Sequence, residues 1–493
     1  MKTTRRRFLS TGSAISLAGT VSPFAMNLAG IGEAAAQSAG PGDDYKAVVC
    51  IFLNGGNDHA NTLVPYDDAS YAQYTSLRAD LAYQKDALEI GPVGSSAPIK
   101  YSNGNTMTGI KKLSELVLSP TTPLPGGRKF ALAPALTSLL PKFDAGRLGV
   151  LLNVGTLARP TTKADYNNRI GLPPRLFSHN DQTSYWQSSG IEGSSIGWGG
   201  RIGDEVAAVG ELRNDISTFS CISISGNAVF LTGRDTFQYQ VTTTGPAPFD
   251  PLRGQIFDSA TCADALGRIV TGTGAGLFEQ EHVSVMSRAI DAADVLNTKL
   301  RAASTVIPAD AKYAALRDGT NSIGQQLAMV ARLIDARAGV GARRQVFYVS
   351  VGGFDLHSDL VKFHSELLRR VGDAMAAFYD WTEAAGVASK VTTFTASEFG
   401  RTFVSNGGGS DHGWGAMHFV LGGAVKGRSY YGTAPQFGNN TPDDVGSGRL
   451  VPTTSVDLVA AELARWMGVP ENRVGQILPN LAAFNGQAID FLA

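Results

Sequence analysis

The sequence predicts an α/β protein with three layers (α/β/α), in which helices cover both faces of a mostly parallel central sheet. Apolar runs of strand length recur at 47–53, 148–154, 221–224, 346–351, 391–395 and 418–421. Most of these runs carry hydrophobic residues on consecutive positions, as strands buried on both faces do. Between them lie segments with apolar residues every three or four positions, and such alternation of strands with helices is typical of α/β folds.

Helical segments lie between the predicted strands. We expect helices over 134–147, 310–337, 359–385 and 456–467. The first begins with Pro134 and ends at Gly146, which are residues suited to those positions. Residues 83–127 and 200–280 include stretches rich in Gly, Ser, Thr and Pro, so we expect surface insertions there. We therefore expect one elaborated domain over 37–493.

The N-terminus predicts export. Residues 4–10 (TRRRFLS) resemble a twin-arginine signal, and a mildly apolar stretch leads from there to small residues at 34–36. We expect residues 1–36 to be a signal peptide, read by the twin-arginine export machinery and removed, which leaves a periplasmic or secreted protein. Pro23 and several Gly and Ser residues interrupt the stretch, so no stable membrane span is expected. The alternative is an uncleaved membrane tether.

Charge and cysteine usage exclude some classes of function. The formal net charge is -1, so no basic field exists that would attract nucleic acid as a partner. Cys50, Cys221 and Cys262 lie far apart and show no Cys-x-x-Cys spacing. Cys50 lies in an apolar run and is expected in the core. Cys221 and Cys262 could form a disulfide outside the cytoplasm, and the sequence alone does not decide this.

Chemically active residues follow three of the predicted strands. They occur at 55–59 (GGNDH), 352–357 (GGFDLH) and 397–402 (SEFGRT), and an Asp-His pair follows at 411–412. The carboxyl ends of parallel strands share one edge of a sheet, so three such loops can meet in one crevice. The sequence therefore predicts a single site at that edge.

Asp355 and His357 are the first candidate metal ligands. They stand two residues apart after a Gly-Gly turn, and in extended backbone this spacing points both side chains the same way. Carboxylate oxygen and imidazole nitrogen together suit zinc, manganese or iron better than calcium or magnesium. The alternative is that Asp355 caps the following helix and His357 fills a polar gap.

Two further ligands are expected from neighbouring loops. His412 is favoured over Asp411, which we expect to cap a segment or to orient a ligand. Asp58 is favoured over His59 because the preceding Gly-Gly permits a tight turn.

Glu398 has two interpretations. It follows a β-branched strand, where a carboxylate is costly to bury without a cation. That cation is either the metal, which leaves Arg401 free to hold an anionic substrate, or Arg401 itself in an ion pair. The sequence leaves both open.

A fourth segment, 177–187 (FSHNDQTSYWQ), places polar groups beside aromatic residues without a helical or strand period, as functional loops do. His179 and Asp181 are candidate ligands, acid–base groups or substrate contacts, and Ser178, Thr183 or Ser184 is a candidate nucleophile. The alternative is an internal loop held by hydrogen bonds. The sequence contains no Gly-x-x-x-x-Gly-Lys phosphate loop.

Together these motifs carry a resemblance. The export signal and the runs 52–58, 177–182, 353–357, 397–402 and 411–413 resemble the domain of unknown function 1501 family of exported bacterial proteins. The match spans nearly the whole chain. That family is similar to the alkaline phosphatase and sulfatase superfamily, whose α/β enzymes hold metals at the carboxyl edge of a central sheet.

The resemblance implies an alkaline-phosphatase-like fold and a divalent metal site. It assigns Asp58 to the position after the first strand, Asp355 and His357 to the first ligand pair, Glu398 to the start of the second pair, and His412 to the last ligand. The first pair is more closely spaced than in alkaline phosphatases, and a Ser-Glu pair replaces an Asp-His pair. No residue matches the superfamily nucleophile motif, and given these departures we expect one or two metal sites. A sulfatase Cys-x-Pro-x-Arg is also missing, which counts against sulfatase chemistry.

Two functions are compatible with these features. The first is an exported metal-dependent hydrolase of small anionic esters, either phosphate esters or related ones such as sulfoesters. The metal would polarise the ester oxygen and activate Thr183, Ser184 or a water, while Arg401 holds the anion. The second is a non-catalytic exported binding or surface-assembly protein that kept the fold and lost turnover.

Overall fold

The computed structural model describes residues 44–246, 254–272, 276–484 and 486–493, so the expected signal peptide lies outside the described residues. The strands of the main sheet are β1 (Lys46–Leu53), β4 (Leu148–Gly155), β5 (Cys221–Ser223), β6 (Tyr239–Gln240), β7 (Arg344–Val351), β8 (Val391–Ala396), β9 (Ala416–Gly422), β10 (Ser429–Tyr431) and β11 (Thr454–Ser455). A small second sheet pairs β2 (Leu63–Pro65) with β3 (Phe130–Leu132).

The main sheet is mostly parallel, as the sequence predicts. Its nine strands follow the order β10-β4-β9-β8-β1-β7-β5-β6, and β11 pairs with β4. Among the described strands of this sheet, only β9 runs antiparallel to its neighbours, β4 and β8. All six predicted strands are present, and β1 lies between β7 and β8 at the centre of the sheet. The loops that follow β1, β7 and β8 therefore lie next to one another.

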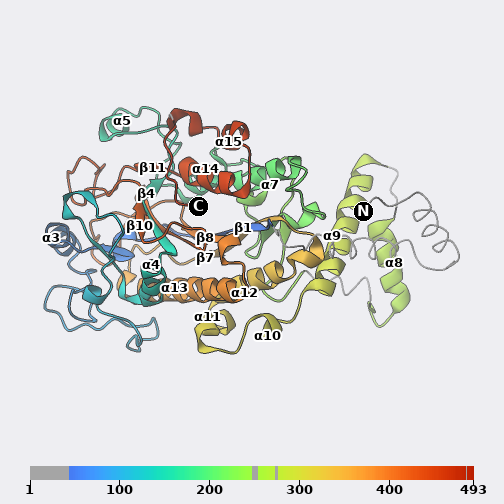
Figure 1. The fold of residues 1–493 in the computed structure, drawn as a ribbon, viewed down its shortest axis with the longest axis horizontal. Helices are drawn as coiled ribbons and strands as arrows, with labels where there is room; N and C mark the ends of the chain where they lie inside the picture. The colour runs from blue at the N-terminus through green and yellow to red at the C-terminus, as the bar shows by residue number, and fades with distance from the viewer. Residues whose placement is uncertain (1–43, 247–253, 273–275, 485) are drawn as a thin grey trace, which may run out of the picture.

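Helices cover both faces of this sheet. Alternate residues of β1 enter two different cores: Val49 and Ile51 belong to one, and Cys50 and Phe52 belong to the other. The first core is closed by α12 (Ser322–Asp335) and α13 (Leu360–Ala384), and the second by α7 (Trp198–Ala208) and α14 (Val456–Met467). Figure 1 shows α12 and α13 below the sheet and α7 and α14 above it. The three-layer arrangement is confirmed.

Two of the four expected helices are interrupted. Segment 134–147 forms η4 (Pro134–Leu139) and then α4 (Leu140–Asp144), because Pro141 has no N–H to continue the hydrogen-bond ladder. In 310–337, η8 (Ala311–Tyr313) and α11 (Ala314–Arg317) end before Asp318, whose carboxylate accepts the N–H of Thr320. A new helix, α12, then begins after its cap, Asn321. The helices expected at 359–385 and 456–467 are confirmed as α13 and α14.

The two expected insertions differ in structure. Residues 83–127 form irregular chain with isolated bridges, such as Tyr83 to Ile90. Segment 200–280 instead supplies β5 and β6 to the main sheet, so it is not simply a surface insertion. Within it, α8 (Ala260–Thr271) lies beyond the body of the molecule together with the start of α9 (Leu277–Lys299) (Figure 1).

The other described helices are short or peripheral. They are α3 (Asp68–Leu77), α5 (Lys163–Asn167), α6 (His179–Ser188), α10 (Ala303–Val306), α15 (Glu471–Ile477), η1 (His59–Asn61), η2 (Leu113–Glu115), η3 (Pro125–Gly127), η5 (Ser217–Phe219), η6 (Val229–Leu231), η9 (Arg337–Val340), η10 (Ala388–Lys390) and η11 (Leu481–Phe484). Of the described helices, none has the length and apolar character needed to cross a bilayer.

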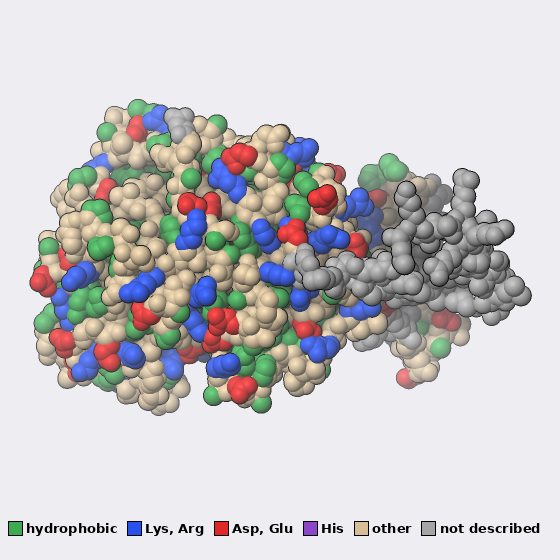
Figure 2. Space-filling model, in the orientation of Figure 1, with side chains coloured by type: hydrophobic (Ala, Val, Ile, Leu, Met, Phe, Trp, Pro, Cys, Tyr) green, Lys and Arg blue, Asp and Glu red, His purple; other side chains and the backbone are tan. Residues whose placement is uncertain are grey.

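Thiols and surface charge can also be placed. Cys50 and Cys221 are buried, Cys262 is exposed, and all three are free, so the structure contains no Cys221–Cys262 disulfide. Figure 2 shows Lys and Arg side chains interspersed with Asp and Glu on the visible face, without a broad patch of one sign.

Candidate metal centre

The loops that follow β1, β7 and β8 meet at the carboxyl edge of the sheet. The Gly55 N–H donates to Glu398 Oε1 over 2.9 Å, and Arg401 donates to the Gly55 carbonyl over 3.1 Å. A Cβ at Gly55, whose φ is 118°, would lie 2.3 Å from the Asp355 nitrogen. Only glycine permits both this conformation and this close approach. The predicted convergence of the three loops is confirmed.

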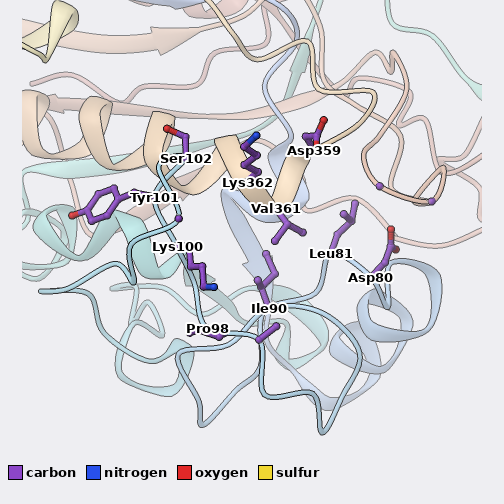
Figure 3. A pocket seen from close by; sticks show the side chains of 14 residues that line it. Asp80, Leu81, Ile90, Pro98, Lys100, Tyr101, Ser102, Asp359, Val361 and Lys362 are labelled. Carbon is purple, nitrogen blue, oxygen red and sulfur yellow. The ribbon is translucent and has the colours of Figure 1, made fainter.

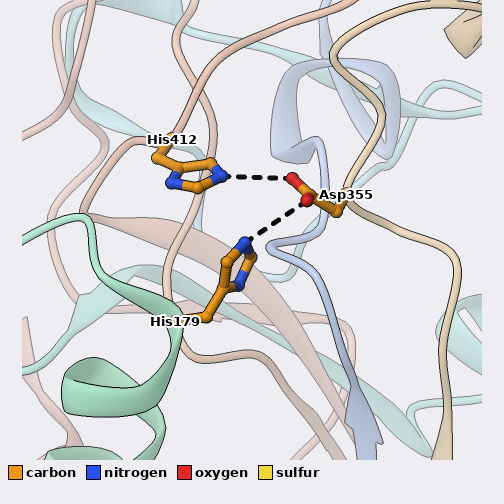
Figure 4. Close-up of side chains that lie close together, drawn as sticks. All are labelled: His179, Asp355 and His412. Carbon is orange, nitrogen blue, oxygen red and sulfur yellow. Dashed lines mark hydrogen bonds and ion pairs between the residues drawn. The ribbon is translucent and has the colours of Figure 1, made fainter.

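A fourth element, α6, reaches the same edge. Segment 177–187 is mostly helical rather than a loop, since α6 spans His179–Ser188. The Ser178 hydroxyl donates to Asp181 Oδ2 over 2.6 Å at the start of the helix, and the buried Trp186 packs into the core beneath it. This helix carries His179 as its first residue and directs it toward Asp355 (Figure 4).

His179, Asp355 and His412 converge from three different elements. One donor atom from each lies within 4.8 Å of the others. His412 Nε2 is 3.1 Å from Asp355 Oδ1, and His179 Nε2 is 3.4 Å from Asp355 Oδ2 (Figure 4). His357 joins them, with its Nε2 3.0 Å from Asp355 Oδ1 and 3.0 Å from His412 Nε2. We call these four side chains the histidine–aspartate cluster.

The three histidines of the cluster are oriented through their other ring nitrogen. His179 Nδ1 lies 2.7 Å from Glu398 Oε1, and His357 Nδ1 lies 2.9 Å from Asp411 Oδ1. His412 Nδ1 lies 2.7 Å from the Phe177 carbonyl oxygen, which can only accept a hydrogen bond. With Nδ1–H committed to these acceptors, each neutral imidazole presents an Nε2 lone pair to the cluster.

This donor set fits a divalent metal ion. Lone pairs on nitrogens about 3 Å from one another and from a carboxylate repel unless a cation lies among them. Two ligands of a tetrahedral ion, each about 2.1 Å from it, are about 3.4 Å apart, close to the separations in the cluster. His179 Nε2 is buried and has no hydrogen-bond partner among the described residues. Hydrogen bonds from Nδ1 to a carboxylate or carbonyl are the usual support of metal-binding histidines.

Electrostatics keeps the central carboxylate ionised. Partial burial opposes ionisation of Asp355, but the hydrogen bond that Arg401 donates, together with the nearby His412 ring, outweighs it and lowers the pKa of Asp355 to about 2. The hydrogen bond to Glu398 raises the pKa of His179, whereas burial lowers the pKa of His412. Asp355 and His357 side chains are 45% and 46% exposed, so one side of the cluster is open to a substrate.

Arg401 is paired with Asp355, a partner that neither of the two interpretations based on the sequence predicted. Its Nη1 donates to Asp355 Oδ1 over 2.8 Å, and its Nη2 donates to the Ser410 carbonyl. The side chain is 1% exposed. Arg401 therefore holds Asp355 in place, and it is neither paired with Glu398 nor free for an anion.

Glu398 is buried beside the cluster. Oε1 accepts from His179 and Gly55, and Oε2 accepts from the Ser397 hydroxyl over 3.1 Å. These contacts make it the group that orients His179. Asp411, expected to cap or to orient a ligand, does orient His357.

Asp58 and Asp181, two of the predicted metal ligands, are held elsewhere. Asp58 forms a buried ion pair with Arg78 at 2.7 Å and accepts the Ser410 hydroxyl over 2.6 Å. Asp181 accepts from Ser178 and is 5% exposed. Neither belongs to the group whose donor atoms converge in the described part of the chain. The neighbouring His59 is also buried, and both its ring nitrogens lack a partner there.

The two predicted nucleophiles lie further along α6. The Ser184 hydroxyl donates to the Ile191 carbonyl over 2.8 Å, in the loop after the helix. Thr183 is half-buried, and no hydrogen bond to the cluster is found for it in the described structure.

Three functional contacts were not predicted from the sequence. They are the Phe177 carbonyl that fixes His412, Arg78 that neutralises Asp58, and the Ser410 carbonyl that holds Arg401. Two of them are backbone oxygens, which carry no residue-type signal. For Arg78 the only signal is that a buried aspartate requires a cation.

Comparisons with known proteins complete the description. No curated protein matches the sequence. The chain is similar to PsFucS1 sulfatase from Pseudoalteromonas sp., with 8% identity, a TM-score of 0.33, and coverage of 96% of this chain and 76% of that one. It is also similar to Ps i-CgsB in complex with k-i-k-neocarrahexaose, with 8% identity, a TM-score of 0.30, and coverage of 90% and 77%. Scores of this size carry no argument about activity. A family model described as protein of unknown function (DUF1501) matches residues 45–478, and the chain belongs to that family.

Proposed function

We propose that this protein is an exported metal-dependent hydrolase of phosphate or related esters, such as sulfate esters. The observation that carries the proposal is the set of Nε2 atoms of His179, His357 and His412, all turned toward the Asp355 carboxylate with their Nδ1 atoms already committed. The imidazoles of His179 and His412 and the carboxylate of Asp355 form a donor set that suits zinc, manganese or iron.

The residues would divide the work as follows. His179, Asp355 and His412 would hold the ion, which supplies Lewis-acid activation of the ester oxygen and of a water. His357 lies at the open side with its ring fixed by Asp411, so its Nε2 is placed to accept a proton from water or to return one to the leaving group. Arg401 would act by positioning Asp355.

Water is the nucleophile in this proposal. Ser184 is turned toward Ile191, and Thr183 makes no hydrogen bond to the cluster among the described residues. A water at the open side of the cluster requires no rearrangement of α6. Replacement of Ser184 or Thr183 by alanine should therefore leave hydrolysis in place.

Export is proposed from residues 1–36 alone. Fusion of these residues to a reporter that is active only outside the cytoplasm should give export through the twin-arginine machinery. Changing Arg5 and Arg6 to lysine should abolish it. Export that persists in the double lysine variant would overturn this part of the proposal.

The decisive experiment is metal analysis of the purified mature protein by plasma mass spectrometry, without added metal. We expect about one or two equivalents of zinc, manganese or iron, lost in Asp355→Ala and retained in Asp373→Ala, a surface carboxylate paired with Arg369. Hydrolysis of aryl phosphates and aryl sulfates should be lost in the same variant. A folded, metal-free protein whose stability is unchanged by added metals would favour the non-catalytic binding protein.

A further inference from the structure

A cavity borders the two loops that carry His357 and Asp411, and Asp359 and Gly408 from these loops line it. It has a volume of about 570 Å³, is open to solvent, and is lined by the irregular chain of 83–127, by Asp80 and Leu81, and by the first turn of α13. Val361 from α13 and Ile90 from the irregular chain face the same space (Figure 3). The volume is within the range of small-molecule sites in proteins.

The lining combines apolar side chains with equal numbers of positive and negative ones. Its apolar side chains are Leu81, Ile90, Ala97, Pro98 and Val361. Its charged side chains are two lysines and two aspartates: Lys100, Lys362, Asp80 and Asp359. Equal numbers of opposite charges give no net field that would select an ion, so the occupant that the lining favours is uncharged and apolar.

The cavity and the cluster share two loops that run side by side. The Ser410 N–H donates to the Leu356 carbonyl over 3.1 Å, and the Leu360 N–H donates to the Gly408 carbonyl over 3.0 Å. His357 and Asp411 join the same loops through their side chains. The cluster therefore lies at one end of this pair of loops and the cavity at the other.

The distance between the two sites is bounded by chain length. Asp355 and Asp359 are four positions apart in the chain, and so are Gly408 and His412. A fully extended chain of four residues spans at most about 14 Å. The backbone positions that carry the two sites therefore lie within the length of one extended small molecule.

We propose that this cavity binds the apolar alcohol portion of the ester whose anionic group lies at the cluster. The inference rests on the proposed hydrolase function and specifies its substrate class: anionic esters of an alcohol with an aliphatic or aromatic body. Esters of short polar alcohols leave the cavity without a partner.

The test measures binding of n-alkylphosphonates, from ethyl to octyl, to the metal-loaded protein by calorimetry. These probes carry the anion without a hydrolysable bond. Each methylene that enters the cavity should tighten binding by about two- to fourfold. Ala97→Trp and Val361→Trp should fill the space and remove the dependence on chain length. Val93→Trp, at a position in the same irregular chain that is 72% exposed, should preserve it.

The outcomes separate the cavity from the metal centre. In Asp355→Ala, affinity should fall for every phosphonate while the dependence on chain length remains. A protein without metal that still shows this dependence would support the cavity and overturn the hydrolase. Equal affinity for all chain lengths in the wild type would overturn the cavity inference, as would a dependence that survives in both tryptophan variants. Because Ala97 is exposed, its variant remains informative even if Val361→Trp does not fold.

Discussion

His179 Nδ1 lies 2.7 Å from Glu398 Oε1, at the point where the first residue of α6 meets the loop after β8. Glu398 is 3% exposed and also accepts the N–H of Gly55, so its position is fixed by the backbone of a third loop. One buried carboxylate thus determines which nitrogen of His179 faces Asp355.

Glu398→Gln should weaken metal binding. The glutamine side chain keeps the size of glutamate, but it is uncharged and offers His179 only a neutral amide oxygen as acceptor. Loss of such a supporting group typically lowers metal affinity or activity by about 10- to 100-fold. Competition with a chromophoric chelator measures the affinity, with Glu383→Gln on the exposed side of α13 as the control. Equal affinity in both variants would mean that Glu398 does not orient a ligand.

Arg401→Lys should reduce both stability and metal affinity. Lysine keeps the charge, but it cannot span Asp355 and the carbonyls of Gly55 and Ser410 together. Unsatisfied buried acceptors cost about 1–3 kcal/mol each, so urea unfolding should show a loss of about that size. Arg465→Lys, at a surface pair with Glu471, should change stability by less than about 0.5 kcal/mol.

Asp58→Asn should destabilise the fold without removing the metal. Asp58 and Arg78 are 2% and 0% exposed, and loss of one partner of a buried ion pair costs about 3–5 kcal/mol. Burial opposes ionisation of Asp58, but the Arg78 charge holds its pKa well below the ordinary value. The stabilisation from this pair is therefore present above about pH 4 and is lost as the pH falls further. Metal lost from folded Asp58→Asn protein would restore Asp58 as a ligand.

His357→Ala should separate turnover from metal occupancy. In the proposed function His357 moves a proton, while His179, Asp355 and His412 hold the ion. We therefore expect the metal content to remain near that of the wild type and kcat to fall by about 100-fold or more. Plasma mass spectrometry and steady-state kinetics on the same preparation measure both. Joint loss of metal and activity would instead identify His357 as a ligand.

Asp457→Asn should change the pH dependence of stability. Burial raises the pKa of Asp457 to about 6, against an ordinary value of 3.8. Between these pH values the folded protein keeps a proton that the unfolded chain has lost, so stability falls as the pH rises from about 4 to about 6. Such a shift corresponds to about 3 kcal/mol. Urea unfolding of wild type and variant between pH 4 and 7 should show a difference that grows with pH, which is expected to be absent for Asp373→Asn.

Much of the fold could be predicted because the signals are local. The apolar runs that form β1, β7 and β8 identify buried strands, and the parallel sheet then brings Asp355, Glu398 and His412 to one edge. Local signals also mislead: Pro141 and the turn at Asp318 interrupt helices that apolar spacing alone would continue. Polar residues in 177–187 obscured α6, whose stability comes from packing of Trp186 rather than from amphipathic spacing.

The sequence by itself determined the fold class, the loops that carry the chemistry and the residue types available there. Tertiary structure alone decided the partners of each group. Asp58 and Asp355 both follow central strands, yet one is neutralised by Arg78 in the interior and the other faces three histidines at an open surface. The physical reason is that a buried charge takes whichever cation the packing brings to it, and packing depends on contacts between residues far apart in the chain.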